Sequence, residues 1–416
     1  MESSLDVAAV GYGVLITIEG WGVNLVGCYG NALVPTPNLD AFAACGCVYD
    51  QYWMHSKSTS DVLQTIQKHG IDSSNWMIIA QQGNSDPCFG SHPGYVEVAL
   101  NGGAEFESSF AELIARSLEL WVSSKHQRPY LWIQAKGLAG IWDAPQEYRQ
   151  VMCDEGDPEP YAGKIRPEMV FSKDYDPDER FRFAAGAGGQ AICLDRGVGE
   201  LSILLEGMEM LDECFVALAG VQGYPLGEHA RIGLGGGEFG EDGEGYSERL
   251  HCPLMLRIGR GESLGRREDV FIQPMGLGGM LKSLVLRAEG TQADMIEVDL
   301  EEQPLSGKVS SALGQTVAYA VGQSELSLIT SRWSGLWSYS ESEAGKLELR
   351  TKGIYCHPED RWQQNEVSGR VPEVDRIMRL IAELLLESRV DGIGELENQS
   401  LELLERLLEE LALQGR

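Results

Sequence analysis

The alternation of two kinds of segment over about the first 285 residues restricts the fold more than any other feature. Four segments are short, apolar or rich in β-forming residues, and end at a glycine or a polar turn: GVLITIEG, NWMIIAQQG, RPYLWIQAKG and CFVALAGVQG. Between them, apolar residues recur every three or four positions, as in Leu194, Val198, Leu201 and Leu205. This alternation of strands and helices predicts a mostly parallel sheet with helices on both faces.

Two irregular stretches interrupt this pattern. Residues 153–181 are rich in Pro, Asp and Glu and are interpreted as a long surface excursion. Residues 233–246 read GLGGGEFGEDGEGY, and the frequent glycines argue against a fixed helix or strand there.

The pattern changes after about residue 290. TVAYAVG, LSLITSR, GLWSYS and KLELRTKG follow one another as short strands, which predicts an antiparallel meander. We therefore expect an α/β domain over residues 1–289, a smaller α+β subdomain over 290–390 and a C-terminal leucine-rich amphipathic helix over 391–416. The final helix carries a leucine seam at Leu401, Leu404, Leu408 and Leu411. Such a seam suits a helix that lies on its own domain, or one that pairs with another chain.

Charge and cysteine usage narrow the choice of partners and compartment. The net charge of -30 over 416 residues repels nucleic acid and anionic membranes, so neither is expected as a partner. The nine cysteines include no C-x-x-C pair, and no apolar run approaches the ~20 residues that span a bilayer. The N-terminus lacks the features of a signal peptide. We expect a reduced, cytoplasmic protein.

Five blocks of the chain, in order, resemble the sulfatase family of the alkaline-phosphatase superfamily. They are residues 14–53 with GCYGN and TPNLD, 138–149 with WDAPQEYR, 218–233 with LGEH, 246–259, and 353–367 with HPEDRWQQN. The resemblance implies an alkaline-phosphatase/sulfatase-like mixed sheet sandwiched by helices, with a smaller C-terminal subdomain of antiparallel sheet and helix. It also implies sulfate-ester hydrolysis with a divalent cation, usually calcium, and a formylglycine made from Cys or Ser in Cys/Ser-x-Pro-x-Arg.

The positions that would hold the metal in that family have mostly lost their ligands. Glu19 and Gly20 stand where the family has an Asp pair, and Val221 and Gln222 stand at the later ligand positions. Calcium takes 6 to 8 oxygen ligands, so this remnant predicts weak binding at best. No cofactor is expected; calcium would be expected only if the chain is an active enzyme.

The positions for the reaction itself are also altered. Ser56 falls at the nucleophile position, but Ser58 replaces the motif proline and Ser60 the motif arginine. Ala139 falls at the position of a family histidine, and Ile141 at that of the following proline. The retained residues are those that serve turns, caps and packing, namely Gly27, Tyr29, Gly30, Pro37, Asn38, Leu39, Asp40, Gly227, Glu228 and His229.

We interpret the chain as a pseudo-sulfatase without hydrolase activity, with a structural or binding role. One alternative is an active, metal-dependent sulfuric or phosphoric ester hydrolase. It would need metal ligands from elsewhere, such as the acidic loop with Glu238, Glu241, Asp242 and Glu244. Another is a protein that self-assembles, or binds a protein partner, through its acidic surface and C-terminal helix.

Overall fold

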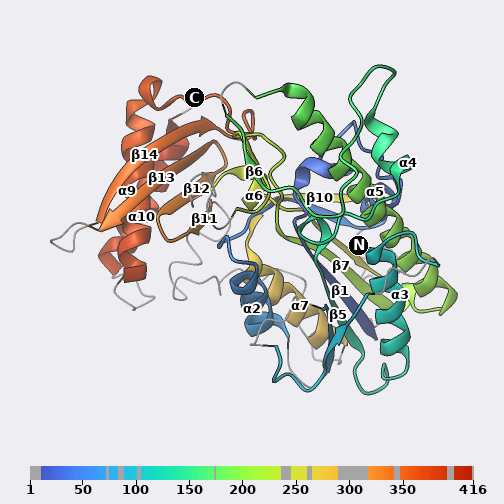
Figure 1. Cartoon of the computed structure of the whole chain (residues 1–416). Coiled ribbons are helices and arrows are strands. Elements are labelled where there is room, and N and C mark those ends of the chain that lie inside the picture. Colours follow the sequence, from blue (N-terminus) through green and yellow to red (C-terminus); the bar gives the residue numbers. More distant parts are fainter. Residues whose placement is uncertain are drawn as a thin grey trace.

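Eight strands form one mixed sheet in the order β10-β2-β9-β7-β1-β5-β3-β4 (Figure 1). The computed structural model describes residues 11–71, 75–82, 89–100, 105–172, 175–235, 245–259, 265–288, 317–341, 347–390 and 398–414. The strands are β1 (Tyr12–Glu19), β2 (Cys47–Tyr52), β3 (Trp76–Gln81), β4 (Tyr95–Val98), β5 (Tyr130–Ala135), β7 (Cys214–Gln222), β9 (Leu254–Ile258) and β10 (Arg266–Ile272). Only β9 among them runs antiparallel to its neighbours, so the predicted mostly parallel sheet is confirmed.

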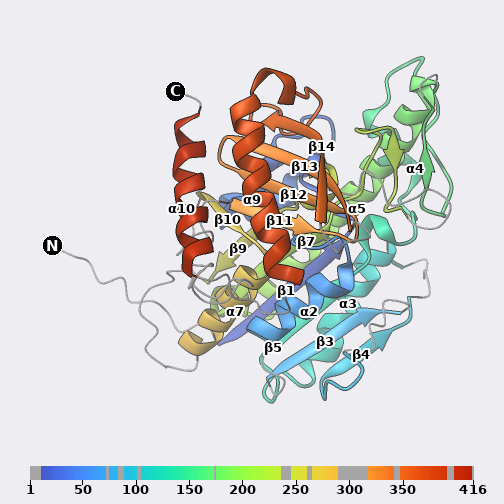
Figure 2. The same ribbon diagram turned by 90° about the vertical axis from the view of Figure 1, so that its left-hand side faces the viewer.

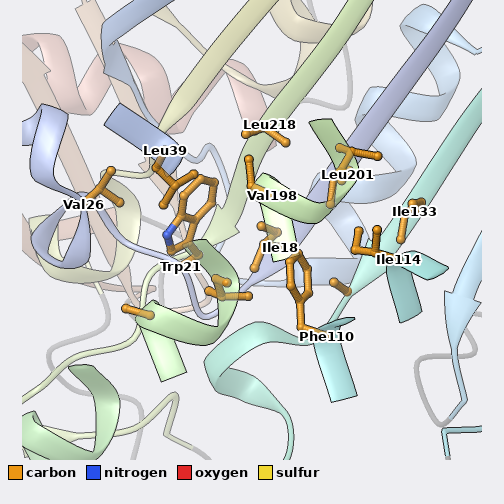
Figure 3. Close-up of a cluster of buried hydrophobic side chains, with 14 of the residues drawn as sticks. Ile18, Trp21, Val26, Leu39, Phe110, Ile114, Ile133, Val198, Leu201 and Leu218 are labelled. Carbon is orange, nitrogen blue, oxygen red and sulfur yellow. The ribbon is translucent and has the colours of Figure 1, made fainter. Parts of the chain in front are cut away.

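Helices cover both faces of this sheet because its central strands are apolar on both sides. One face carries α1 (Pro37–Ala44), α3 (Ser109–Val122) and α5 (Pro177–Gly207), and the other carries α2 (Thr59–Gly70) and α7 (Pro274–Ala288). On the first face Ile18 and Leu218 of the sheet pack near Val198 and Leu201 of α5 (Figure 3). Among the described residues, no helix combines the length and apolarity needed to cross a bilayer.

Helix α5 begins earlier than the sequence pattern predicts. The proposed excursion ran to residue 181, but the helix starts at Pro177 after the cap residue Asp176, whose carboxylate accepts a hydrogen bond from the backbone N–H of Asp178 at 3.0 Å. Asp followed by Pro is a common helix start, since proline suits the first helical position. Short elements occupy the adjoining loops: α4 (Gln146–Arg149), β6 (Met169–Val170), β8 (Arg231–Ile232) and α6 (Ser247–Leu250).

The C-terminal part forms a second sheet, as predicted. Its four antiparallel strands are β11 (Val317–Val321), β12 (Glu325–Thr330), β13 (Trp333–Glu341) and β14 (Leu347–Cys356). Helix α9 (Pro372–Val390) packs against them, and α10 (Asn398–Leu413) stands beside α9 (Figure 2). The predicted boundaries at 289 and 391 fall outside the described residues, so they stay predictions.

The leucine seam of α10 faces the interior of this subdomain. Leu404 and Leu411 are buried in one cluster with Ile377 and Ile381 of α9, and Leu408 packs at its edge. The side chain of Leu401 lies outside the described residues. This packing favours the interpretation in which the helix lies on its own domain.

We expect Leu404→Ala to lower the free energy of unfolding by about 2–3 kcal/mol, because it removes buried methyl groups and leaves a cavity between α9 and α10. Urea unfolding monitored by circular dichroism measures the effect. Glu405→Ala, an exposed change on the same helix, is the matched control. If the seam served another chain instead, Leu404→Ala would leave the stability of the monomer unchanged and alter only association.

Candidate functional site

The site lies at the carboxyl ends of β1 and β7, which the parallel register places side by side. Glu19 is the last residue of β1 and pairs with Gln222 at the end of β7. In α/β sheets this edge is the usual place for ligands. The structure thus brings Glu19, Gly20 and Gln222 together, whereas the side chain of Val221 is buried in the core on the face of α2 and α7.

Gly20 cannot carry a second carboxylate in this backbone arrangement. Its φ is +75°, and a Cβ built on it would lie 2.6 Å from the backbone nitrogen of Ala139. Side chains other than glycine are strained at such a φ, and the nearby backbone leaves no room. Ala139 belongs to the short turn after β5, so the positions of the family's lost aspartate and lost histidine are in direct contact.

Thr59 is a residue of the site that the sequence analysis missed. It opens α2, where the hydroxyl of Ser58 caps the helix by accepting a hydrogen bond from the N–H of Asp61. The Thr59 hydroxyl lies 2.9 Å from Oε1 of Glu19 and 3.2 Å from Oε1 of Gln222, and its single proton serves one of them at a time. Nε2 of Gln222 donates to the carbonyl of Lys57 at 2.6 Å.

The serines at the positions of the reactive motif are engaged in local contacts. The Ser56 hydroxyl donates to the Asp61 carboxylate at 2.9 Å and accepts from the N–H of Ser58 at 3.1 Å. Ser60 accepts from the side chain of Gln64 at 2.8 Å. Among the described residues, neither serine has a hydrogen bond to Glu19 or Gln222, a role that falls to Thr59 instead.

Three cationic side chains act electrostatically on Glu19, and the sequence analysis named none of them. Burial raises the pKa of Glu19 above its ordinary value, and the hydrogen bond from Thr59 opposes that rise. The positive charges of three further residues also oppose it, namely Lys136, Arg166 and Arg249. They come from the end of β5, from the excursion and from α6, so no short motif unites them.

Each cation is held close to the strand ends. Lys136 precedes Gly137, whose Cβ, if present, would lie 2.5 Å from the carbonyl oxygen of Glu19. Arg166 donates from Nη1 to the carbonyl of Ala139 at 2.7 Å, and its Nε lies 3.1 Å from the Glu168 carboxylate. Arg249 is buried and donates to the carbonyl of Leu234.

These donors do not fit the calcium ion that the resemblance implies. Of the four expected ligand positions, Gly20 and Val221 offer no side-chain oxygen. Oε1 of Glu19 and Oε1 of Gln222 both lie within hydrogen-bond distance of the Thr59 hydroxyl. Calcium takes 6 to 8 oxygen ligands, and nearby positive charges oppose its binding. Within the described ranges, no group of three or more His, Cys, Asp or Glu could hold a metal. The acidic loop of the active-enzyme alternative, residues 238–244, lies outside the described residues.

The retained residues have structural roles. Nδ2 of Asn38 and the backbone N–H of Leu39 both bind the buried Asp195 carboxylate, at 2.7 and 2.8 Å, which fixes α1 on α5. His229 stacks on Tyr246 and its Nδ1 lies 2.7 Å from Oε1 of the buried Glu248. Burial lowers the pKa of His229, but Glu248 outweighs this, so the pKa is raised.

Comparison with known proteins identifies the architecture. No protein-family model and no curated protein sequence matches the chain. Solved structures do: a 2-O GAG sulfatase has a TM-score of 0.61 and 12% identity, with 92% of each chain covered. The phosphonate monoester hydrolase of Agrobacterium radiobacter gives 0.60 and 14%, covering 92% of this chain and 96% of its own. A protein solved with its substrate D-glucosamine-2-N,6-O-disulfate gives 0.60 and 13%, covering 92% and 98%. These likenesses show the fold.

Proposed function

We propose that this chain, which has the fold of the sulfatases, does not hydrolyse sulfate or phosphate esters and has a structural or binding role. The observation that carries the proposal is the Thr59 hydroxyl between Glu19 and Gln222. This neutral hydroxyl lies within hydrogen-bond distance of both Glu19 and Gln222, the two polar side chains that remain at the ligand positions. Catalysis by a metal ion would require those oxygens for the ion, which orients the ester and offsets developing charge.

The serine chemistry supports the same proposal. An active nucleophile needs a base within hydrogen-bond reach and a place for the reacting atom near groups that stabilise charge. Ser56 has the Asp61 carboxylate within hydrogen-bond reach, but it lies in the turn before α2, and among the described residues no hydrogen bond joins it to the side chains of Glu19 or Gln222 at the strand ends. Without the proline and arginine of the modification motif, we expect it to stay an unmodified serine.

We expect no turnover of aryl sulfates or aryl phosphates by the purified chain, supplied in turn with calcium, magnesium, zinc and manganese. The control is the Ser56→Ala, Glu19→Ala double variant, prepared in parallel. Release of aryl alcohol clearly above that of the control, with any of the metals, would refute the proposal. Mass spectrometry of residue 56 tests for an aldehyde in the same sample.

A cytoplasmic location is part of the proposal. All eight described cysteines carry free thiols, as is usual for proteins of a reducing compartment. Fractionation of the source cells checks this point, and recovery from an extracytoplasmic fraction would contradict it.

A further inference from the structure

Two isoleucines are exposed on the segments beside α4. Ile141 is 54% exposed and Ile165 is 81% exposed, although isoleucine is among the residue types that are most often buried in folded proteins. In both views α4 lies on the side of the molecule away from α10, so the C-terminal helices leave this region uncovered (Figures 1 and 2). Single exposed apolar side chains are common on protein surfaces, whereas adjacent ones mark a site of interaction.

The two segments that carry these isoleucines lie side by side and run in opposite directions. The backbone N–H of Trp142 donates to the carbonyl of Lys164 at 3.0 Å. At the next contact along the pair of segments, the guanidinium of Arg166 donates to the carbonyl of Ala139 at 2.7 Å. The two isoleucines, which lie between these contacts in the sequence, are therefore opposite each other. We call them the isoleucine pair.

The buried guanidinium of Arg149 holds both segments in place. It donates to the carbonyls of Trp142 and Ala144 in the first segment, at 2.8 and 2.9 Å. It also donates to the carbonyls of Tyr161 and Gly163 in the second segment. Since one side chain joins the two segments, the isoleucine pair is presented in a fixed arrangement. A surface that is already ordered loses less conformational entropy when a partner binds.

Carboxylates dominate the charge of the segments around the isoleucine pair. Residues 141–165 contain six acidic residues and two basic ones, Lys164 and the buried Arg149. Five of the six carboxylates belong to exposed residues, namely Glu147, Asp154, Glu155, Asp157 and Glu159. The sixth, Asp143, lines a small pocket that Ile141 also lines. An apolar patch in acidic surroundings is complementary to a partner that is apolar and basic.

We infer that the isoleucine pair and the carboxylates around it bind a basic segment of a partner protein, in which an apolar side chain is flanked by lysine or arginine. The apolar side chain packs on the isoleucine pair, and a cationic one is attracted to Asp143. A second copy of this chain is a poor occupant, because two chains that each carry a net charge of -30 repel one another. The inference does not use Glu19, Thr59 or Gln222, so it is independent of the proposed absence of ester hydrolysis.

Fluorescence anisotropy with labelled synthetic peptides tests the inference on the full chain. In the first peptide leucine and lysine alternate, in the second serine replaces leucine, and in the third glutamate replaces lysine. We expect saturable binding of the leucine–lysine peptide and none of the leucine–glutamate peptide. The serine–lysine peptide should bind about tenfold more weakly or worse, because it buries no apolar side chain. Added sodium chloride should weaken the binding, since salt screens the attraction between charges.

Matched variants show where the peptide binds. Ile141→Ser and Ile165→Ser, combined in one chain, remove the apolar patch and should weaken the leucine–lysine peptide about tenfold or more. Asp143→Asn keeps the shape of the pocket but removes its charge, and should weaken the peptide several-fold. Ile203→Ser, at an isoleucine of α5 that is 68% exposed, and Glu405→Gln, on α10, should change nothing. Thermal unfolding of each variant confirms that it is folded.

The inference is wrong if the leucine–lysine peptide shows no saturable binding, or if the serine–lysine peptide binds as tightly. It is also wrong if the paired serine substitutions leave the affinity unchanged, or if Ile203→Ser lowers it equally, because the peptide would then recognise only the acidic surface at large. Light scattering of the chain alone tests the other occupant. Self-association that the paired serine substitutions abolish would assign the surface to a second copy and overturn the inference of a basic partner.

Discussion

Replacing Arg149 by Met should lower the free energy of unfolding by about 3–5 kcal/mol, the largest effect that we expect from a single substitution. Arg149 is 3% exposed, and its guanidinium donates hydrogen bonds to four backbone carbonyls in the segments around α4. Nε donates to the carbonyl of Ala144 at 2.9 Å and Nη2 to that of Trp142 at 2.8 Å. Nη1 donates to the carbonyls of Tyr161 and Gly163, at 2.5 and 3.3 Å.

The size of this effect follows from what the substitution leaves behind. Methionine can occupy much of the volume, but it cannot donate, so four backbone carbonyls in a mostly buried place lose their partner. A buried acceptor without a partner costs about 1–3 kcal/mol, and partial entry of water limits the sum. Burial lowers the pKa of Arg149. A guanidinium in a protein nevertheless keeps its charge.

Arg149→Lys is the informative companion variant. An ammonium keeps the charge but lacks the planar fork, so it should reach only some of the four carbonyls and give an intermediate loss. Urea unfolding should rank the proteins as wild type, then Arg149→Lys, then Arg149→Met. Equal stability of wild type and Arg149→Lys would show that charge alone matters, and no loss in Arg149→Met would show that the carbonyls find other partners.

The hydrogen bonds of Arg149 also affect the candidate site. The segment from Trp142 to Gly163 leads directly to Arg166, whose guanidinium binds the carbonyl of Ala139 at the end of β5. A loosened excursion would therefore also weaken the contact of Arg166 with the end of β5.

The elements of the fold were largely predictable, because the spacing of apolar residues and the residues that favour turns are both local features of the sequence. The strands β1, β3, β5 and β7 and the meander from β11 to β14 all agree with the sequence patterns. The retained TPNLD segment also has the packing role that we expected, through Asn38 and Asp195.

The composition of the site was less predictable. Comparison with the family motif assigned the nucleophile position to Ser56. In the structure Ser58 caps α2, and the first residue of that helix, Thr59, is the one whose hydroxyl contacts Glu19. The three cations stand on separate segments, and one of them, Arg166, lies within the excursion, which has no periodicity. Their approach to Glu19 depends on long-range packing, which a single sequence does not encode in any short pattern.

Acid should destabilise this protein through two buried histidines at the junction of the two sheets. His251 stacks on Trp53 with ring centroids 4.3 Å apart, and its Nε2 lies 2.7 Å from the carbonyl oxygen of Asp50. The ring of His357 packs edge-on against Trp53, and its Nε2 lies 3.3 Å from Oε1 of Gln51. Burial lowers the pKa of His251 to about 3 and that of His357 to about 4.

The sign of the effect follows from these depressed values. In the unfolded chain a histidine takes up its proton near pH 6.5, whereas the folded protein holds both rings neutral until the pH is far lower. The stabilisation that the two neutral histidines contribute is therefore fully present above about pH 6.5, and it is lost as the pH falls toward their folded pKa values. Between pH 7 and pH 5 each histidine should remove roughly 2 kcal/mol, and the two together about 4 kcal/mol.

Other groups act in the opposite direction, so the comparison must isolate the two histidines. Burial raises the pKa values of Glu19, Asp195 and Glu248, and such carboxyls favour the folded state as the pH falls. His229, whose pKa is raised, also gives its stabilisation at low pH. The wild-type curve alone is therefore a sum of opposing contributions, and its slope is smaller than the histidines would give by themselves.

The His251→Gln, His357→Gln double variant removes the two titrating rings and keeps an amide near the position of each Nε2. We expect it to be less stable than the wild type at pH 7, because it loses the stacking on Trp53. Its loss between pH 7 and pH 5 should be smaller than that of the wild type by about 4 kcal/mol. Urea unfolding at both pH values measures the difference, with the exposed His126→Gln as the control. An unchanged difference between pH 7 and pH 5 in the double variant would mean that both rings can take up protons in the folded protein, which would require water or an anionic group beside Trp53.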